Sequence, residues 1–384
     1  MASSTLSIAM IVRNEADLLP GFLQHAAPWA DEISVVDTGS DDGSPLIAER
    51  AGCKVAHFAW RDDFAAARNE SLRLCACDWI LVLDADERID PGDWVRLRQL
   101  AAGMHDVCYR FTTRNYSNAE HLSGFTHCAP GDPHSRGFAG WSPSVKVRLF
   151  PNGAGARFDG AIHELVNESL ERAGLRLVAA GVPIHHYPLL RPPERVLAKQ
   201  ALYLRLGREK VAARPNDPQA HVELGRQLVE MGDLLAAVAA YRDALRLAPR
   251  SAQILRELGA TLFCIDRHAE ARRALELAVE FEPGMADAWR NLGVIHAYAG
   301  AWDAAFPCLE EAVRLEPANA VLHEYLAEAL HQLGRAEEAA AARARAQALR
   351  GTAHSSQSRG QEDANDKKDT RTNPSHGCGE PQPH

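Results

Sequence analysis

Apolar residues in the first hundred positions follow two alternating spacings. Short, largely aliphatic runs occur at residues 6–12, 32–39, 54–60 and 79–83. Between these runs, apolar residues recur every three or four positions, which is the spacing of one face of a helix. Successive strand and helix units of this length predict a mostly parallel, Rossmann-like α/β sheet with helices on both faces.

The pattern between Val107 and Pro188 is less regular. Strand-like segments occur at 107–113, 144–150 and 175–186. We expect this region to complete the sheet and to form the second wall of a cleft. The first domain is therefore predicted to span residues 1–190.

From residue 216 the pattern repeats every 34 residues. Three series keep this spacing: Pro215, Pro249, Pro283 and Pro317; Leu224-Gly225, Leu258-Gly259 and Leu292-Gly293; and Ala237, Ala271, Ala305 and Ala339. Small residues let paired helices approach closely, and proline stops a helix before the next unit. The period is that of tetratricopeptide repeats. It predicts four units over 216–350 in an all-α solenoid, joined to the first domain by a helix over 191–215.

Residues 351–384 contain almost no aliphatic side chains and are rich in polar residues, so we expect this tail to be disordered. Its His376, Cys378 and His384 are metal-competent types, but a solvated tail is the favoured interpretation.

Composition narrows the class of protein. The chain has 384 residues, is 46% hydrophobic and 24% charged, and carries a formal net charge of −9. Without a dense Lys or Arg run, it is not expected to bind nucleic acid. The N-terminus lacks the basic region of a signal peptide, and no apolar run is long enough to span a bilayer, so we expect a cytoplasmic protein without a transmembrane segment. The eight cysteines form no CxxC pair, which favours scattered reduced thiols.

The segment DWILVLDADERID suggests where chemistry takes place. The apolar run Trp79–Leu83 reads as a buried strand, and it is followed at once by Asp84, Asp86 and Glu87. In open α/β sheets, ligands bind just beyond the carboxyl ends of the strands. Carboxylates at this place suit a hard divalent cation and the phosphate that it carries.

Several motifs occur in a fixed order: MIVRNEADLL, VVDTGSDDGS, DDFAAARNESL, LVLDADE and FDGAIHELV. Together they resemble family 2 glycosyltransferases of the GT-A fold, and in particular the subgroup that carries tetratricopeptide repeats behind the transferase. The resemblance covers roughly Ser7 to Arg350.

This resemblance implies roles for the paired aspartates. Asp86 is expected to ligate Mn²⁺ or Mg²⁺, and Asp84 to contact the ribose of the donor or the metal through water. The cation would stabilise the negative charge of a departing nucleoside diphosphate. Two surface acids after a strand are the alternative.

Nucleotide recognition is expected at the ends of the first two strands. The resemblance places Asn14 or Glu15, and Asp37, against the nucleotide. The carboxylate of Asp37 can accept from the uracil imide or from ribose hydroxyls. A turn aspartate in TGSDDGS is the alternative for Asp37.

Arg68 is placed near the donor by the same resemblance, where it would pair with a carboxylate of the site or with phosphate. A surface helical arginine is equally compatible with the sequence. Asp62 and Asp63 precede this helix, and Asp63 is also a candidate for its N-cap.

Glu164 and His163 match the later acidic position of the family. An inverting transferase needs a base that takes the proton of the acceptor, and Glu164 is the candidate, with His163 sharing the role or approaching metal or phosphate. The alternative is that Glu164 is solvated at the start of an amphipathic helix.

Further polar residues have less defined roles. His121, His127, Cys128 and His134 fit no zinc spacing, so a mobile loop over the acceptor cleft is favoured. One of His185 and His186 is expected near the diphosphate or the metal, with a packed core histidine as the alternative. Lys146 and Arg148 are candidates for the cleft floor.

The sequence therefore predicts an inverting, metal-dependent glycosyltransferase that uses a nucleotide sugar, most simply UDP-linked. The acceptor would be a protein, peptide or glycan, and the repeats would bind the acceptor or a partner protein. A repeat scaffold with an inactive transferase domain is the alternative. A nucleotidyltransferase is disfavoured because RNEADLLPG replaces the glycine-rich phosphate loop expected after the first strand.

Overall fold

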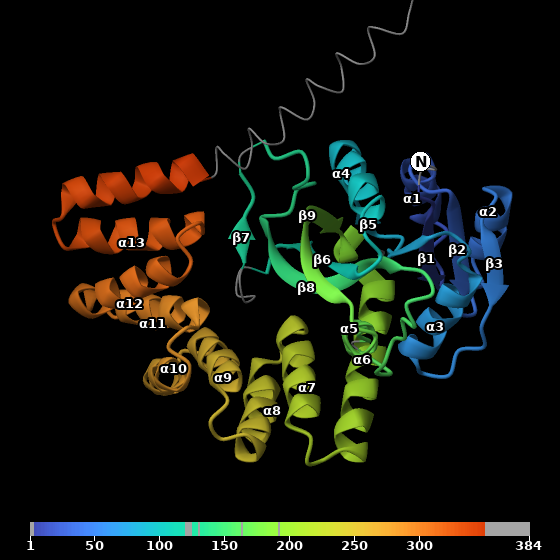
Figure 1. Cartoon of the computed structure of the whole chain (residues 1–384). Coiled ribbons are helices and arrows are strands. Elements are labelled where there is room, and N and C mark those ends of the chain that lie inside the picture. The colour runs from blue at the N-terminus through green and yellow to red at the C-terminus, as the bar shows by residue number, and fades with distance from the viewer. Residues whose placement is uncertain (1–3, 120–124, 130, 163, 191–192, 350–384) are drawn as a thin grey trace, which may run out of the picture.

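The structure, a computed structural model, describes residues 4–119, 125–129, 131–162, 164–190 and 193–349. An N-terminal α/β domain is followed by a long helix and an arc of paired helices (Figure 1). The predicted tail, 351–384, lies outside the described residues, as does His163. No helix among the described residues has the length and apolarity needed to cross a membrane.

The first half of the sheet is parallel. Its strands lie in the order β3-β2-β1-β4, and their bounds are β1 (Leu6–Val12), β2 (Glu32–Asp37), β3 (Lys54–His57) and β4 (Trp79–Val82). The connections are helical: α1 (Leu19–Ala26), α2 (Ser44–Arg50) and α3 (Phe64–Leu74). The alternating strand and helix pattern predicted this half, because each unit is local in the sequence.

The second half of the sheet is mixed. Beyond β4 the strands follow in the order β8-β6-β9-β5. The short strand β7 pairs with β8 outside this order. The bounds are β5 (Glu87–Arg88), β6 (Val107–Ser117), β7 (Thr126–His127), β8 (Gly140–Pro151) and β9 (Arg176–His186). β8 runs antiparallel to both β4 and β6, whereas β6 and β9 are parallel. The parallel part of the predicted, mostly parallel sheet thus ends at β4, which pairs with β8, a strand from much later in the chain.

Strand β4 is buried on both faces because each face packs against its own helices. Trp79 and Leu81 belong to the core formed with α1 and α4 (Pro91–Ala101). Ile80 and Val82 belong to the core formed with α3 and α5 (Asn167–Arg172). Successive strand residues point to opposite faces, so an unbroken apolar run is what this double packing requires.

The repeats form antiparallel helix pairs. Their helices are α7 (Pro218–Glu230), α8 (Leu234–Leu247), α9 (Ala252–Cys264), α10 (His268–Phe281), α11 (Ala286–Tyr298), α12 (Trp302–Leu315), α13 (Ala320–Gln332) and a last helix over 336–349. The periodic glycines lie where the helices of a pair meet. A Cβ on Gly259 would lie 2.7 Å from Leu275 Cγ, and one on Gly293 would lie 2.7 Å from Leu309 Cγ. The 34-residue period therefore reflects close helix packing.

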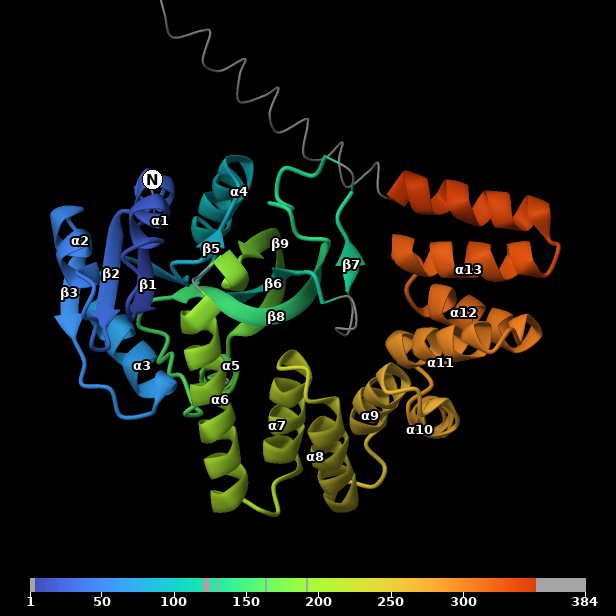
Figure 2. The ribbon, with the colours of Figure 1, turned by 180° about the vertical axis from the view of Figure 1, so that it is seen from behind.

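The long helix α6 (Pro193–Ala213) joins the two parts and extends from the α/β domain to the side of α7 (Figures 1 and 2). Its Arg195 donates to the carbonyl of Asn14, at 2.6 Å. Its Tyr203 ring lies 5.2 Å from the ring of Phe64, at the start of α3. These contacts lie at the edge of the sheet where β1 and β3 end, so the first helix before the repeats lies along that edge.

Candidate active site

Four predicted residues lie at the carboxyl edge of the parallel strands. Asn14 follows β1, Asp37 is the last residue of β2, and Asp84 and Asp86 follow β4. Since β1, β2 and β4 are parallel neighbours, these ends meet at one side of the sheet. This is the position at which open α/β sheets bind ligands.

Arg68 connects two of the predicted site residues. Its Nη2 donates to both oxygens of Asp84, at 2.7 and 2.9 Å, and its Nε donates to Glu164 Oε1 at 3.3 Å. Arg68 lies on α3 and is only 5% exposed, so it is not the surface arginine that the sequence left open. Glu164 lies 96 positions after Arg68 in the chain.

The charges in this cluster stabilise one another. Burial alone would raise the pKa of Asp84, but the neighbouring Arg68 and Arg148 charges outweigh it and lower that pKa to about 2. Burial alone would lower the pKa of Arg68, but the Asp84 and Glu164 carboxylates raise it. Both groups are therefore charged throughout the physiological range. Nη1 of Arg68 is buried and has no hydrogen-bond partner among the described residues.

A second buried ion pair fixes the loop that carries the aspartates. Glu87 is 2% exposed, and its Oε1 accepts from Arg148 Nη2 at 2.6 Å. Its Oε2 accepts from the backbone N–H of Asp84 at 2.9 Å. Arg148 was predicted to lie on the cleft floor. In the structure it is the ion-pair partner of Glu87. The role of Glu87 was not predicted, although it stands next to the DxD pair in the sequence.

Asp86 lies against a histidine of β9. His186 Nε2 is 3.3 Å from Asp86 Oδ2, and its Nδ1 is 2.7 Å from the side-chain oxygen of Asn115. Since that oxygen can only accept, Nδ1 carries a proton, and in the neutral ring Nε2 presents a lone pair toward the carboxylate. Two lone pairs that face each other repel, so this arrangement favours a cation between His186 Nε2 and Asp86, or a proton on Nε2. Of the two candidate histidines, His186 is the one beside Asp86. Asn115 had no signal in the sequence.

Glu164 is largely buried, with 11% of its side chain exposed. It precedes α5 and lines a small cavity together with Arg68, Lys146 and Arg148. Burial and the charge of Arg148 lower the pKa of Lys146. Glu164 is thus not the solvated helix residue of the alternative interpretation. His163, its predicted companion, lies outside the described residues.

The nucleotide residues predicted at β1 and β2 take part in loop structure. Asp37 is 3% exposed and accepts from the backbone N–H groups of Gly39 and Ser40. Its Oδ2 also lies 3.3 Å from His57 Nδ1. The turn role proposed as the alternative for Asp37 is therefore present, and nucleotide recognition by its remaining acceptor capacity stays a prediction.

Asn14 has a left-handed backbone, with φ of 57°, which asparagine tolerates better than most residues. Its side-chain oxygen accepts from the backbone N–H of Asp41, and its own N–H donates to Ser40 Oγ. The backbone N–H of Glu15 donates to Ser44 Oγ. The β1–α1 and β2–α2 loops are thus bound to each other, and nucleotide contact by Asn14 or Glu15 stays a prediction.

The acids before α3 have structural roles. Asp63 is the N-cap of α3 and accepts from the backbone N–H of Ala66 at 2.9 Å, as the capping interpretation predicted. Asp62 accepts from Trp60 Nε1 and from Arg205 of α6, both at 2.9 Å. This aspartate therefore ties α6 to the α/β domain.

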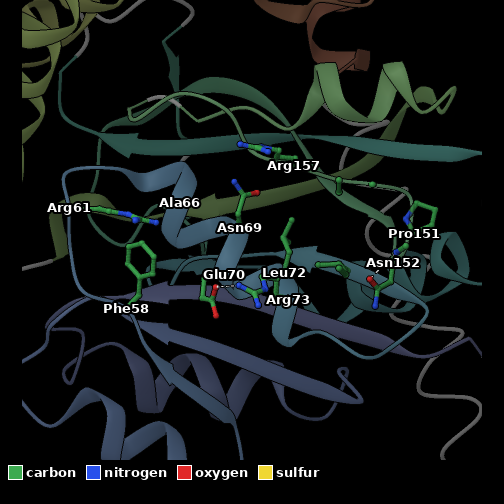
Figure 3. Close-up of a pocket in the computed structure, with 14 residues that line it drawn as sticks. Phe58, Arg61, Ala66, Asn69, Glu70, Leu72, Arg73, Pro151, Asn152 and Arg157 are labelled. Atoms are coloured by element: carbon green, nitrogen blue, oxygen red, sulfur yellow. Dashed lines mark hydrogen bonds and ion pairs between the residues drawn. The ribbon is translucent and has the colours of Figure 1, made fainter.

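A cavity of about 560 Å³ lies between α3 and the residues at the end of and after β8 (Figure 3). Asn69 lines it and is itself bound to both the N–H and the carbonyl of Phe158. Among the described residues, its lining includes neither Asp84 nor Asp86. The cavity thus belongs to the junction between α3 and the segment after β8, and not to the carboxyl edge of the sheet.

Comparison with known proteins identifies both the transferase domain and the repeats. The family model of glycosyl transferase family 2 matches residues 7–152, and tetratricopeptide repeat models match 222–284 and 286–319. A TPR repeat-containing protein of Synechococcus elongatus is 31% identical over 335 residues, covering 82% of this chain and 77% of the relative. The chain belongs to glycosyl transferase family 2. The repeats follow its transferase domain, as the motifs predicted.

Two further similarities cover single parts of the chain. An uncharacterized glycosyltransferase of Rickettsia bellii is 33% identical over 89 residues, which are 23% of this chain and 30% of that protein. The crystal structure of MamA is similar over 42% of this chain and 95% of its own, at 22% identity and a TM-score of 0.39.

Proposed function

We propose that this protein is an inverting, metal-dependent glycosyltransferase that moves a sugar from a nucleoside diphosphate donor, UDP-linked in the simplest case, to a protein, peptide or glycan acceptor. The observation that carries the proposal is the buried cluster in which Arg68 binds Asp84 and Glu164 together. It lies at the carboxyl edge of the parallel strands, where the fold accepts ligands. A cytoplasmic location remains our prediction.

The residues around Asp86 fit a divalent cation. A carboxylate and an imidazole nitrogen with a lone pair are ligands that Mn²⁺ accepts, and Asp86 and His186 supply one of each. Both oxygens of Asp84 are bound to Arg68, so we assign direct ligation to Asp86 and contact through water or ribose to Asp84. A cation here would supply Lewis-acid stabilisation of the leaving diphosphate.

The site also offers positive charge from the protein itself. Nη1 of Arg68 is buried without a partner among the described residues and can donate to a phosphate oxygen. The Lys199 charge of α6 contributes to the lowered pKa of Asp84, so α6 brings a second cation toward the same edge. These groups would bind the diphosphate before and after the glycosidic bond breaks.

Glu164 is our candidate for the base. In the transfer, an acceptor oxygen or sulfur forms the new bond to the anomeric carbon, the bond to the diphosphate breaks, and the acceptor proton passes to the Glu164 carboxylate. The salt bridge to Arg68 holds this carboxylate in a fixed orientation. Arg68 is therefore a positioning residue for two groups: Asp84 on the donor side and Glu164, the candidate base, on the acceptor side.

The repeats are proposed to bind the acceptor or a partner protein. α6 packs along the edge of the transferase domain that carries the site, and α7 follows it directly. A polypeptide held by the repeat helices would therefore be held close to the transferase. Stacked helix pairs commonly provide extended surfaces for peptides and proteins.

The donor is tested by a thermal-shift screen of nucleotide sugars with and without Mn²⁺, on the wild type and on Asp86→Asn. We expect UDP-sugars to raise the melting temperature of the wild type only with Mn²⁺, and not that of the variant. Asp106→Asn is the control, since Asp106 pairs with Arg176 in an exposed ion pair before β6. Equal stabilisation of Asp86→Asn would remove the metal assignment.

The base is tested by Glu164→Gln, which keeps the size of the side chain. We expect donor binding to persist while transfer, measured as release of the nucleoside diphosphate with acceptor present, falls roughly 10²–10⁴-fold. Glu168→Gln, on the exposed side of α5, should keep wild-type turnover. Full activity of Glu164→Gln would exclude this base. Stabilisation by peptides but by no nucleotide sugar would instead support an inactive transferase domain on a repeat scaffold.

A further inference from the structure

Asp90, His134 and His185 form a cluster beside the donor site but directed away from it. One carboxylate oxygen and one ring nitrogen from each histidine all lie within 4.8 Å of one another. His134 Nε2 is 3.0 Å from Asp90 Oδ2. His185 and His186 are consecutive residues of β9, and successive strand residues point to opposite faces. His186 faces Asp86, so this cluster lies on the other side of the sheet.

The orientation of Asp90 is unusual for its place in the chain. It is the N-cap residue of α4, a position at which aspartate normally accepts from the N–H groups of the first turn. Its side chain makes no capping hydrogen bond and instead turns toward His134. This carboxylate is therefore directed into the cluster.

His185 provides a buried nitrogen without a partner. The residue is 1% exposed, and its Nδ1 lies 2.9 Å from the hydroxyl of Tyr116. Its Nε2 is fully buried and has no hydrogen-bond partner among the described residues. When Nδ1 donates to the tyrosine oxygen, Nε2 carries a lone pair, which is how a neighbouring group prepares a histidine to bind a metal.

The third member is held in place by its surroundings. Tyr187 donates its hydroxyl to the carbonyl of His134 at 3.1 Å. The His134 ring is stacked on that of His185, with centroids 4.0 Å apart. The backbone N–H of His134 donates to Asp132. The segment that carries His134 is thus bound to the end of β9 even before a metal is considered.

We propose that Asp90, His134 and His185 bind a zinc-class transition metal ion, at a site separate from the cation of the donor. Two imidazoles and one carboxylate are a common ligand set for zinc, with water at the fourth position. Bonds of about 2.0–2.1 Å place tetrahedral ligand atoms roughly 3.4 Å apart. Asp90 Oδ2 and His134 Nε2 are already 3.0 Å apart, so the three ligand atoms, which all lie within 4.8 Å, would come to this spacing by movement of these two groups toward His185.

The ion would join three parts of the chain that are far apart in sequence: the start of α4, the segment around His134, and β9. The residue after His185 is His186, which faces Asp86, so fixing the end of β9 also fixes the histidine beside the donor site. The loop that the sequence placed over the acceptor cleft would be fastened at His134.

The test uses the full-length protein, stripped with a chelator and dialysed against Zn²⁺ alone, with metal content and a competing chromophoric chelator as readouts. We expect one tightly bound zinc per chain in the wild type, and a Co²⁺-substituted form with the visible absorption of a four-coordinate site. His134→Gln should weaken zinc binding at least 100-fold and abolish the rise in melting temperature that zinc causes. Asp90→Asn, which is nearly isosteric, should have the same effect if His134→Gln folds poorly.

Two controls separate this site from others. His127→Gln changes an exposed histidine of the same region and should keep the zinc. Asp86→Asn should also keep it, because the donor cation is a different one. Zinc bound equally by wild type and His134→Gln, or lost in Asp86→Asn, would overturn the proposal. So would a wild type that retains no zinc.

Discussion

Charged residues are paired differently in the two parts of this protein. In the transferase domain, the ion pairs of the site are buried and join distant positions: Arg68 and Glu164 are 96 residues apart, and Glu87 and Arg148 are 61 apart. In the repeats, many pairs are exposed and local, such as Arg314 with Glu311 and Arg335 with Glu338, each three residues apart. The first kind of pair depends on the whole fold, and the second needs only a helix.

This difference shows where each part obtains its stability. The helices of a repeat pair meet at small residues. The exposed ion pairs on the repeat surface add little to stability because water screens them. The site of the transferase domain holds several charges out of water, and each depends on its partner to remain there. We therefore expect substitutions of similar chemistry to have unequal effects in the two parts.

The largest effect is expected from removing the charge of Arg68. Arg68→Met keeps much of the side-chain volume but leaves Asp84 and Glu164 partly buried without their cation. We expect a loss of about 3–5 kcal/mol of stability in the transferase domain, together with loss of donor turnover. Calorimetry with and without donor measures the first, and release of the nucleoside diphosphate measures the second.

The matched control is Arg314→Met in the repeats. Arg314 makes an exposed pair with Glu311, so its substitution should not measurably change the unfolding transition. If the two variants lost equal stability, the contrast between buried and exposed pairs would be wrong.

A smaller effect is expected from crowding the repeats. A Cβ on Gly259 would lie 2.7 Å from Leu275 Cγ and 3.2 Å from the carbonyl oxygen of Ala271. Gly259→Ala should therefore destabilise the repeats by about 1–3 kcal/mol while donor binding by the transferase domain stays unchanged. Gly284→Ala is the control, because nothing lies within 4 Å of its added Cβ. Chemical denaturation and the nucleotide-sugar thermal shift report the two quantities, and a stable Gly259→Ala would show that the helix pairs are loosely packed.

The smallest effect is expected from acid. The pKa of Asp84 is lowered to about 2 in the folded protein, below its ordinary value of 3.8. Its contribution to stability is therefore complete above pH 4 and is lost as the pH falls toward 2. We expect this loss to be on the order of 1–2 kcal/mol, after allowance for the partial exposure of the side chain.

Acid denaturation of wild type and Asp84→Asn between pH 5 and 2 measures this contribution. The variant should be less stable than wild type near pH 5 and should lose less as the pH falls. Parallel curves would show that Asp84 does not keep a lowered pKa.

Much of the architecture could be predicted from the sequence. The strands β1 to β4 and the 34-residue helix pairs lie where the apolar spacing placed them, because each is determined by neighbours in the chain. Asp63 was identified as a candidate cap because a cap acts within one helical turn. The insertion of β8 beside β4 could not be predicted, since strand pairing across 60 or more residues leaves no local pattern.

The candidate site shows the same division. Asp84, Asp86, Arg68 and Glu164 were each selected from motifs, but the sequence left open whether Arg68 lay on the surface and whether Glu164 was solvated. The roles of Asn115 and Glu87 were missed: a single asparagine in a strand has no distinguishing context, and the motif around Glu87 does not reveal its partner. Their roles depend on partners 71 and 61 residues away.

The sequence by itself determined the family, the strand that carries the aspartates and the period of the repeats, because these depend on side chains at short, regular spacings. Only the tertiary structure decided that one buried arginine serves both Asp84 and Glu164, and that consecutive histidines of β9 face two different acidic partners. The physical reason is that burial and charge pairing are properties of the folded sheet, which brings together side chains that the chain keeps up to 100 residues apart.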